Sequence, residues 1–145
     1  MSKNNINQTI IFLCFLVASV ATLGSLFFSE VMEFIPCTMC WYQRIFLYPL
    51  VLIFLVNLLY PDDKVFKYAF SLILVGLGIS IYHNLLMWGI IPESIVPCRQ
   101  GVPCSTEYFN YFGFINIPFL SLSSYILILI LLIIGKNKKT EYKEV

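Results

Sequence analysis

The chain of 145 residues is too apolar for a soluble domain of its length. Hydrophobic residues make up 59% of it and charged residues only 12%, whereas globular domains average about 45–50% and about 25%. The net charge is +1 and the mean hydropathy is +0.85. A soluble domain this small cannot bury so much apolar surface. The composition excludes intrinsic disorder, nucleic-acid binding through bulk charge and a small disulfide scaffold, and it indicates an integral membrane protein.

Four apolar runs are long enough to cross a bilayer as helices, which takes about 20 residues each. They cover about 9–28, 41–60, 66–88 and 117–135. The runs are continuous and do not alternate in segments of about 10 residues, which excludes a transmembrane β-barrel. The first run is longer than the apolar part of a signal peptide, about 7–15 residues, so we expect it to be retained. The sequence predicts an all-α fold, a single four-helix transmembrane domain over residues 1–145.

Positive charges are concentrated on one side of the predicted bundle. The two tails and the short second loop hold seven lysines, whereas the opposite side holds two arginines. Because positive residues collect on the cytoplasmic side, both termini are predicted to be cytoplasmic and the first and third loops extracytoplasmic. The positively charged residues are Lys3, Lys64, Lys67, Lys136, Lys138, Lys139 and Lys143 on one side, and Arg44 and Arg99 on the other.

Four of the five cysteines fall in the two outward loops. Cys37 and Cys40 form a CxxC motif at the outer mouth of the second span, and Cys98 and Cys104 lie in the third loop. Two structural disulfides, a four-thiolate zinc site and two redox-active dithiols are the alternatives. The CxxC spacing and an oxidising exterior favour redox activity. Cys14, inside the first span, is interpreted as a packing residue.

The CxxC motif lies at a predicted helix N-terminus, because Pro36 precedes it and the helical run starts at Trp41. The helix dipole and the free N–H groups there favour a thiolate. Arg44 follows Cys40 by one helical turn on the same face. A cation is costly inside a membrane and indicates a functional site. Arg44 is therefore predicted to stabilise the Cys40 thiolate or a reduced, anionic cofactor, and snorkelling to lipid headgroups is the alternative.

The segment PCTMCWYQR at residues 36–44 resembles the DsbB/BdbC family of disulfide bond formation proteins. The resemblance extends over essentially the whole chain, with four helices, both tails inside and a second cysteine pair between the third and fourth helices. The compact Cys98–Cys104 pair is similar to that of the shorter, BdbC-type members. The resemblance implies a thiol–quinone oxidoreductase of the bacterial cytoplasmic membrane. Such an enzyme reoxidises an extracytoplasmic thioredoxin-fold thiol oxidase and passes two electrons to a ubiquinone- or menaquinone-type quinone.

The resemblance also implies a role for each site residue. Cys98 forms the mixed disulfide with the partner and releases Cys104, which exchanges with Cys37. Cys40 is then freed as the thiolate that meets the quinone, and Arg44 matches the quinone-proximal arginine of the family. Only five residues separate Cys98 from Cys104, fewer than in many members, which leaves open which thiol contacts Cys37. The spacing favours resting disulfides Cys37–Cys40 and Cys98–Cys104, one of three possible connectivities.

Two further segments carry open interpretations. His83, the only histidine, lies about five residues inside the third span, roughly 7–8 Å below its rim. It is predicted to reach the depth of Arg44 and donate to a quinone carbonyl, and a hydrogen bond between helices is the alternative. The aromatic segment 108–114 is interpreted as an interfacial belt, with partner docking or quinone covering as its alternative.

Two other classes of protein compete with this interpretation. A vitamin K epoxide reductase also builds a four-helix core with a CxxC pair, but it carries that pair on its last helix. A non-catalytic four-span protein with structural disulfides is the other rival, and the spacing of Arg44 from the CxxC motif argues against it. The chain has no haem-attachment CxxCH, dinucleotide loop or iron–sulfur spacing. A lipid-soluble quinone needs none of these motifs, and no nucleic-acid partner is expected.

Overall fold

The computed structural model describes residues 3–62, 64–92 and 117–141. In these ranges the chain forms four long α-helices and one π-helical turn, and no strand. The all-α, four-helix membrane fold predicted from the apolar runs is therefore confirmed. The elements are α1 (Lys3–Leu26), η1 (Phe27–Val31), α2 (Thr38–Leu59), α3 (Val65–Met87) and α4 (Ile117–Glu141).

Each helix is long and apolar enough to cross a membrane. The candidate spans are Asn7–Val31, Thr38–Leu59, Val65–Met87 and Ile117–Asn137, and their ends differ by a few residues from the predicted runs. Large apolar side chains cover the outside of the bundle, and Leu23, for example, is 66% exposed. A helix satisfies its own backbone hydrogen bonds, so such a surface is stable in lipid.

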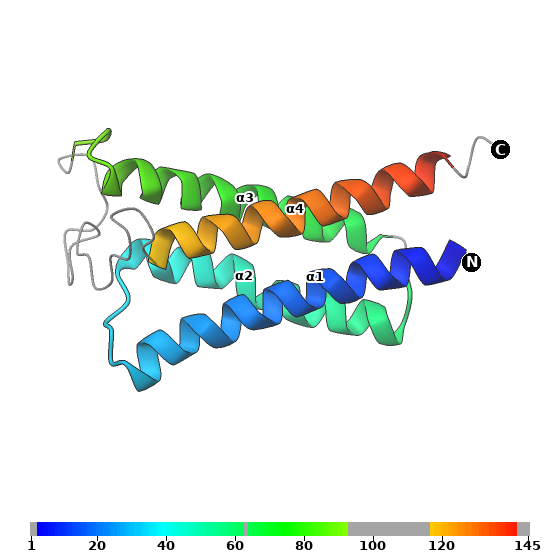
Figure 1. Ribbon diagram of the computed structural model, residues 1–145, viewed down its shortest axis with the longest axis horizontal. Coiled ribbons are helices and arrows are strands. Elements are labelled where there is room, and N and C mark those ends of the chain that lie inside the picture. The colour runs from blue at the N-terminus through cyan, green and yellow to red at the C-terminus, as the bar shows by residue number, and fades with distance from the viewer. Residues whose placement is uncertain (1–2, 63, 93–116, 142–145) are drawn as a thin grey trace.

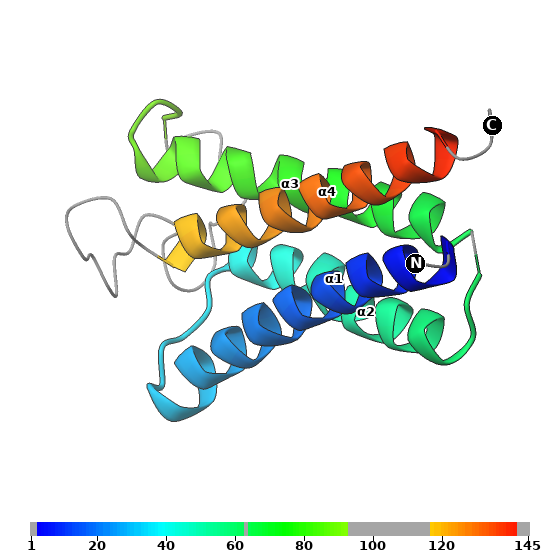
Figure 2. The ribbon, with the colours of Figure 1, turned by 45° about the vertical axis from the view of Figure 1, so that its right-hand side comes forward.

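The helices pack in ring order, α1 on α2, α2 on α3, α3 on α4 and α4 on α1. The start of α1, the end of α4 and the α2–α3 connection lie at one end of the bundle, which we call the terminal end (Figure 1). The connection from α1 to α2 lies at the opposite end, which we call the CxxC end. Both ribbon views show α1 diverging from α4 toward the CxxC end (Figures 1 and 2).

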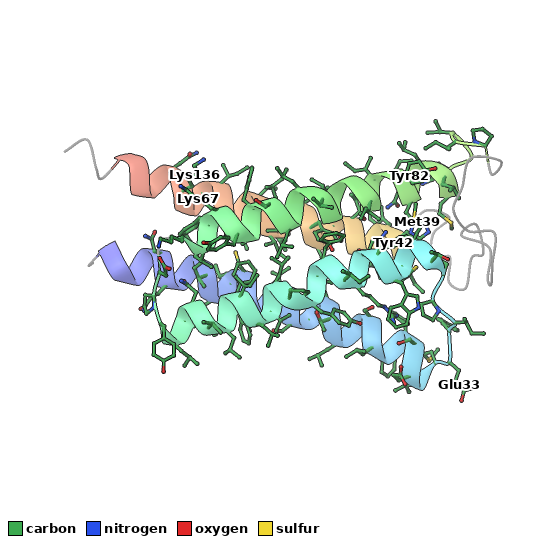
Figure 3. All side chains as sticks on the ribbon, turned by 180° about the vertical axis from the view of Figure 1, so that it is seen from behind. Glu33, Met39, Tyr42, Lys67, Tyr82 and Lys136 are labelled. Atoms are coloured by element: carbon green, nitrogen blue, oxygen red, sulfur yellow. The ribbon has the colours of Figure 1, made fainter. Side chains whose placement is uncertain are left out.

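Basic side chains gather at the terminal end. Figure 3 shows Lys67 of α3 and Lys136 of α4 at that end, whereas Met39, Tyr42 and Tyr82 lie at the CxxC end. The fold thus places Lys67 and Lys136 at the end opposite the CxxC motif, as the charge pattern predicts.

The main apolar core extends from the terminal end to the middle of the bundle. All four helices contribute buried side chains to it. Cys14 is fully buried in it, which agrees with its interpretation as a packing residue. The buried members of this core are Ile10, Ile11, Cys14, Ala18, Leu47, Leu50, Phe54, Val65, Ala69, Ile73, Tyr125, Ile128 and Leu132.

Close packing around Tyr125 connects this core to the CxxC end. Gly76 of α3 makes room for the ring, because a Cβ there would lie 2.5 Å from Tyr125 Cε1. The fully buried Tyr125 donates its hydroxyl to the backbone carbonyl of Gln43 in α2 at 2.7 Å. Nearer the CxxC end, Asn84 of α3 donates to the carbonyl of Pro118 in α4 at 3.1 Å. These bonds fix the positions of α2, α3 and α4 relative to one another.

Candidate redox-active site

The two cysteines of the CxxC motif lie at the N-terminus of α2. Helix α2 begins at Thr38, earlier than the predicted start at Trp41, because Cys37 acts as the N-cap. The Cys37 Sγ atom accepts the backbone N–H of Cys40 at 3.4 Å. Both thiols are free, and their sulfur atoms lie 3.1 Å apart. The motif therefore lies at a helix N-terminus, as predicted. Its two cysteines are free thiols in hydrogen-bond contact, whereas the sequence spacing favours a resting disulfide between them.

Helix α3 contributes a histidine to this dithiol. The Nε2 atom of His83 lies 3.8 Å from Cys37 Sγ, and the side-chain amide Nε2 of Gln43 lies 3.1 Å from His83 Nδ1. Cys37, Gln43 and His83 are all buried, with exposed fractions of 8%, 5% and 1%. Gln43, His83 and Cys37 thus form one chain of polar contacts across the α2–α3 interface.

The neighbours of Cys37 favour its thiolate. The hydrogen bond from the Cys40 thiol lowers the pKa of Cys37 most strongly, burial opposes this, and His83 adds to the lowering. The net effect brings the pKa of Cys37 from 9.0 to about 4. The reduced pair therefore favours its negative charge on Cys37, where the N-terminal dipole of α2 also stabilises it.

Arg44 extends from α2 toward the end of α1. Its Nη2 donates to the backbone carbonyl of Ser25 at 3.0 Å, and its guanidinium carbon lies 5.7 Å from the centre of the Trp41 ring. Both contacts suit a guanidinium, which is a strong donor and binds aromatic faces. They hold the positive charge beside the face of α1 that lines the cavity described next.

A cavity of about 600 Å³ lies between α1, α2 and α4. Cys37, Cys40, Gln43, Arg44 and His83 all line it, so the cavity reaches the dithiol. The walls from α1 and α4 are mostly apolar, and they include Leu16, Val17, Val20, Ala21, Leu120 and Leu127. An apolar cavity with a few polar groups at one end is typical of a site for a small organic ligand.

The predicted site residues meet only in part within the described structure. Cys37, Cys40, Arg44 and His83 come from two helices and reach one cavity. His83 contacts Cys37, and it also borders the cavity in which its predicted quinone contact would lie. Cys98, Cys104 and the segment 108–114 lie outside the described residues.

Gln43 was quoted in the sequence motif but received no role there. An amide inside an apolar span is itself a signal, because a polar side chain in a membrane helix needs a partner. Its separation from Cys40 by three residues also places it near the thiols. The partner, His83, depends on how α2 and α3 rotate against each other, and no local pattern in the sequence predicts that rotation.

The fold and the site together define a four-helix membrane protein with a buried dithiol at the mouth of an apolar cavity. The family model "Disulfide bond formation protein DsbB" matches residues 7–135 of the chain. The chain belongs to this family of disulfide bond formation proteins.

Curated relatives match the chain over most of its length. The chain is 47% identical over 139 residues to "Disulfide bond formation protein C" of Bacillus subtilis (strain 168), covering 96% of this chain and 99% of the relative. It is 38% identical over 139 residues to "Probable disulfide formation protein C 1" of Bacillus anthracis, covering 95% and 100%. A third relative, "Probable disulfide formation protein C" of Halalkalibacterium halodurans, is 43% identical over 115 residues, covering 79% and 84%. No solved structure matches the chain.

Proposed function

We propose that the chain is a thiol–quinone oxidoreductase of the bacterial cytoplasmic membrane that supports disulfide bond formation in exported proteins. It takes two electrons from a reduced, extracytoplasmic thioredoxin-fold thiol oxidase and passes them to a ubiquinone- or menaquinone-type quinone. The observation that carries the proposal is the opening of the Cys37–Cys40 dithiol into the apolar cavity. Membership of the family of disulfide bond formation proteins supports the thiol chemistry.

The residues of the cavity fit a quinone. Its apolar walls suit an isoprenoid tail, and the polar side chains at its other end suit a ring with two carbonyl oxygens. A quinone bound there would supply a two-electron, two-proton acceptor. Arg44 would hold its reduced, anionic form by charge, and His83 would donate to a carbonyl oxygen. Both residues line the cavity, and Arg44 is held in position by Ser25.

Electrons enter through the second cysteine pair. A thiolate of the partner attacks Cys98 in the Cys98–Cys104 disulfide and releases Cys104, and the second partner thiol then displaces Cys98. The partner leaves with its own disulfide, and the loop pair keeps two electrons and two protons. Such exchange requires only an attacking thiolate and access to a sulfur atom.

The loop pair then reduces the pair at the start of α2. Cys104 attacks Cys37 and releases Cys40, and Cys98 next attacks Cys104 and releases Cys37. The loop disulfide closes again, and the reduced Cys37–Cys40 pair holds the two electrons. The lowered pKa of Cys37 assists the last exchange, because a thiol of low pKa is the better leaving group.

His83, oriented by Gln43, provides a hydrogen-bond donor to Cys37. With the Gln43 amide donating to Nδ1, His83 carries its proton on Nε2, which faces Cys37 Sγ. The Nε2–H group can therefore donate a hydrogen bond to the departing Cys37 thiolate and stabilise its charge. Oxidation of the pair then releases two electrons and the thiol proton of Cys40, and the second proton that reduction of a quinone requires comes from water.

The sidedness of the site follows from charge. Lys67 and Lys136 lie at the terminal end, opposite the CxxC motif (Figure 3). Since basic residues favour the cytoplasmic face, we assign the terminal end to the cytoplasm and the CxxC end to the exterior. A thioredoxin-fold partner outside the cell then reaches the cysteine loops directly.

Anaerobic turnover tests the proposal. Purified protein is mixed with quinone and a reduced thioredoxin-fold dithiol protein, and the quinone absorbance is followed. We expect stoichiometric loss of quinone that depends on Cys40 and is abolished by Cys40→Ser. Cys14→Ser is the matched control, because it removes a thiol that lies in the apolar core, away from the CxxC motif. Absence of quinone loss, or equal loss in the Cys40→Ser variant, contradicts the proposal.

A further inference from the structure

Three metal-ligating side chains converge at the start of α2. The Sγ atoms of Cys37 and Cys40 and a ring nitrogen of His83 all lie within 4.8 Å of one another. The two sulfur atoms are 3.1 Å apart, and Cys37 Sγ lies 3.8 Å from His83 Nε2. Figure 3 labels Met39 of α2 and Tyr82 of α3, the sequence neighbours of these ligands, at this end of the bundle.

We propose that the reduced Cys37–Cys40 pair and His83 form a binding site for a thiophilic divalent cation, Zn²⁺ in the first place. This Cys₂His site differs from the four-thiolate zinc site considered for the loop cysteines, because its third ligand is a histidine of α3. The fourth coordination position faces the cavity that the three ligands line, so water can occupy it. Three protein ligands with an open position are an established arrangement for zinc.

The observed distances are close to those of a tetrahedral site. With Zn–S near 2.3 Å and Zn–N near 2.0–2.1 Å, neighbouring ligand atoms lie about 3.8 Å apart for two sulfurs and about 3.6 Å for sulfur and nitrogen. The observed 3.8 Å between Cys37 and His83 already agrees with this. The sulfur atoms must separate from 3.1 Å, which takes small rotations of two short side chains.

Charge and ligand type favour zinc over the harder cations. Two thiolates and a neutral imidazole around Zn²⁺ have no net charge, which suits a buried site. Thiolate and imidazole are ligands of Zn²⁺, whereas Mg²⁺ and Ca²⁺ bind oxygen. The site is also selective for redox state, because the disulfide form offers no thiolate.

A second residue, Gln43, can orient the histidine as a metal site requires once its amide turns. Zinc-bound histidines usually donate their other ring N–H to a neighbouring acceptor, which fixes the orientation of the ring. Gln43 lies 3.1 Å from His83 Nδ1, and a half-turn of its amide places the oxygen there as the acceptor. Its backbone carbonyl is held in turn by the Tyr125 hydroxyl at 2.7 Å.

A bound metal ion would inhibit the enzyme. Coordination occupies both sulfurs, so the pair can neither re-form its disulfide nor deliver electrons to the cavity. This regulatory consequence rests on the proposed function, whereas metal binding itself does not. The site would make the oxidoreductase sensitive to zinc only while its CxxC pair is reduced.

Direct titration tests the binding. The full chain carries Cys98→Ala and Cys104→Ala, which removes competing loop thiols, and is reduced and titrated with Zn²⁺ against a chromophoric chelator. Co²⁺ serves as a second probe, because thiolate ligation and tetrahedral geometry give it characteristic absorption bands. We expect one equivalent of metal in the reduced form and none after oxidation of the pair.

Variants separate the ligands from their surroundings. His83→Gln should weaken binding by more than the roughly 10–100-fold typical for loss of an outer partner, and Gln43→Ala by about that factor. Cys14→Ala, the matched control, should leave the affinity unchanged. The absence of metal binding, equal binding after oxidation, or equal affinity in the His83→Gln variant would overturn the site. Since Gln43→Ala leaves all three ligands in place, an unchanged affinity there contradicts the orienting role even if the His83 variant does not fold.

Turnover measurements test the regulatory part. Zn²⁺ should inhibit quinone reduction by the unmodified chain, and the inhibition should be relieved by a chelator. Inhibition that persists in the His83→Gln variant at the same metal concentration contradicts the proposal. A chain that binds zinc as expected but never reduces quinone retains the metal site and overturns the proposed function, so the two failures are distinguishable.

Discussion

Two regions of the bundle each bury a cysteine, but they surround its thiol with different groups. Near the middle of the bundle, Cys14 is fully buried and packs into an apolar core that all four helices build. At the CxxC end, Cys37 is almost as buried, but it contacts a second thiol and a histidine. Similar burial therefore leaves the two thiols in different chemical surroundings. The hydrogen-bond partners and the helix N-terminus at Cys37 make the difference.

The largest expected effect on the rate of quinone reduction comes from replacing Cys37, with the replacement of Cys14 as its control. Cys37→Ala removes a reacting atom, and the rate of quinone reduction should fall by at least about 10³-fold. Cys14→Ala should leave that rate unchanged, because Cys14 lies in the apolar core. Steady-state quinone absorbance measures both variants. Comparable losses in the two would show that the contrast between the regions is wrong.

The next effect concerns the cation at the cavity. Arg44→Ala should weaken the apparent quinone affinity or the turnover by roughly 10–100-fold, the range expected for a charged hydrogen bond. Arg44→Lys keeps the charge but loses the planar fork, so it should retain part of the activity. The dependence of rate on quinone concentration measures both. Full activity in the alanine variant would show that Arg44 does not act on the quinone and would favour its contact with lipid headgroups.

A third prediction concerns the junction of the two regions and is read out as stability. Gly76→Ala places a Cβ 2.5 Å from the Tyr125 ring, and the free energy of unfolding should fall by about 1–3 kcal/mol. Gly78→Ala is the matched control, because nothing lies within 4 Å of its added Cβ. In the control, the higher helix propensity of alanine should stabilise α3 by about 0.5–1 kcal/mol. Unfolding in detergent measures both, and equal stabilities would contradict the close packing at Tyr125.

The smallest effect separates two tyrosine hydroxyls. Tyr125→Phe removes the donor to the Gln43 carbonyl and should cost about 0.5–1.5 kcal/mol of stability. Tyr48→Phe should be neutral or slightly stabilising, because the buried Tyr48 hydroxyl has no hydrogen-bond partner among the described residues. The same unfolding measurement compares the two. A larger loss of stability in Tyr48→Phe than in Tyr125→Phe would show that the Tyr48 hydroxyl, and not that of Tyr125, makes the stabilising hydrogen bond.

The sequence predicted the fold well because a bilayer leaves few alternatives. Continuous apolar runs must become helices, and their number and approximate ends follow from length alone. The start of α2 was predicted three residues late, at Trp41 and not at Thr38. Cys37 is an unusual N-cap, since a sulfur atom replaces the oxygen of the usual capping residues.

The candidate site was predicted less completely. The CxxC motif and Arg44 are visible in the sequence because both are local to one helix. The contacts of His83 with Cys37 and Gln43 depend on the rotation of α3 against α2. The hydrogen bond of Arg44 to a backbone carbonyl of α1 leaves no trace in residue type, since every residue carries a carbonyl.

A single-turnover experiment tests the central claim most directly. The chain with Cys98→Ala and Cys104→Ala is reduced, freed of reductant under anaerobic conditions and mixed with quinone in a stopped-flow instrument. If the Cys37–Cys40 pair passes its electrons to a quinone in the adjoining cavity, one quinone disappears for each dithiol that becomes a disulfide, and Cys40→Ser abolishes the reaction. Retention of the free thiols with quinone present, or quinone loss that continues without Cys40, would contradict the account.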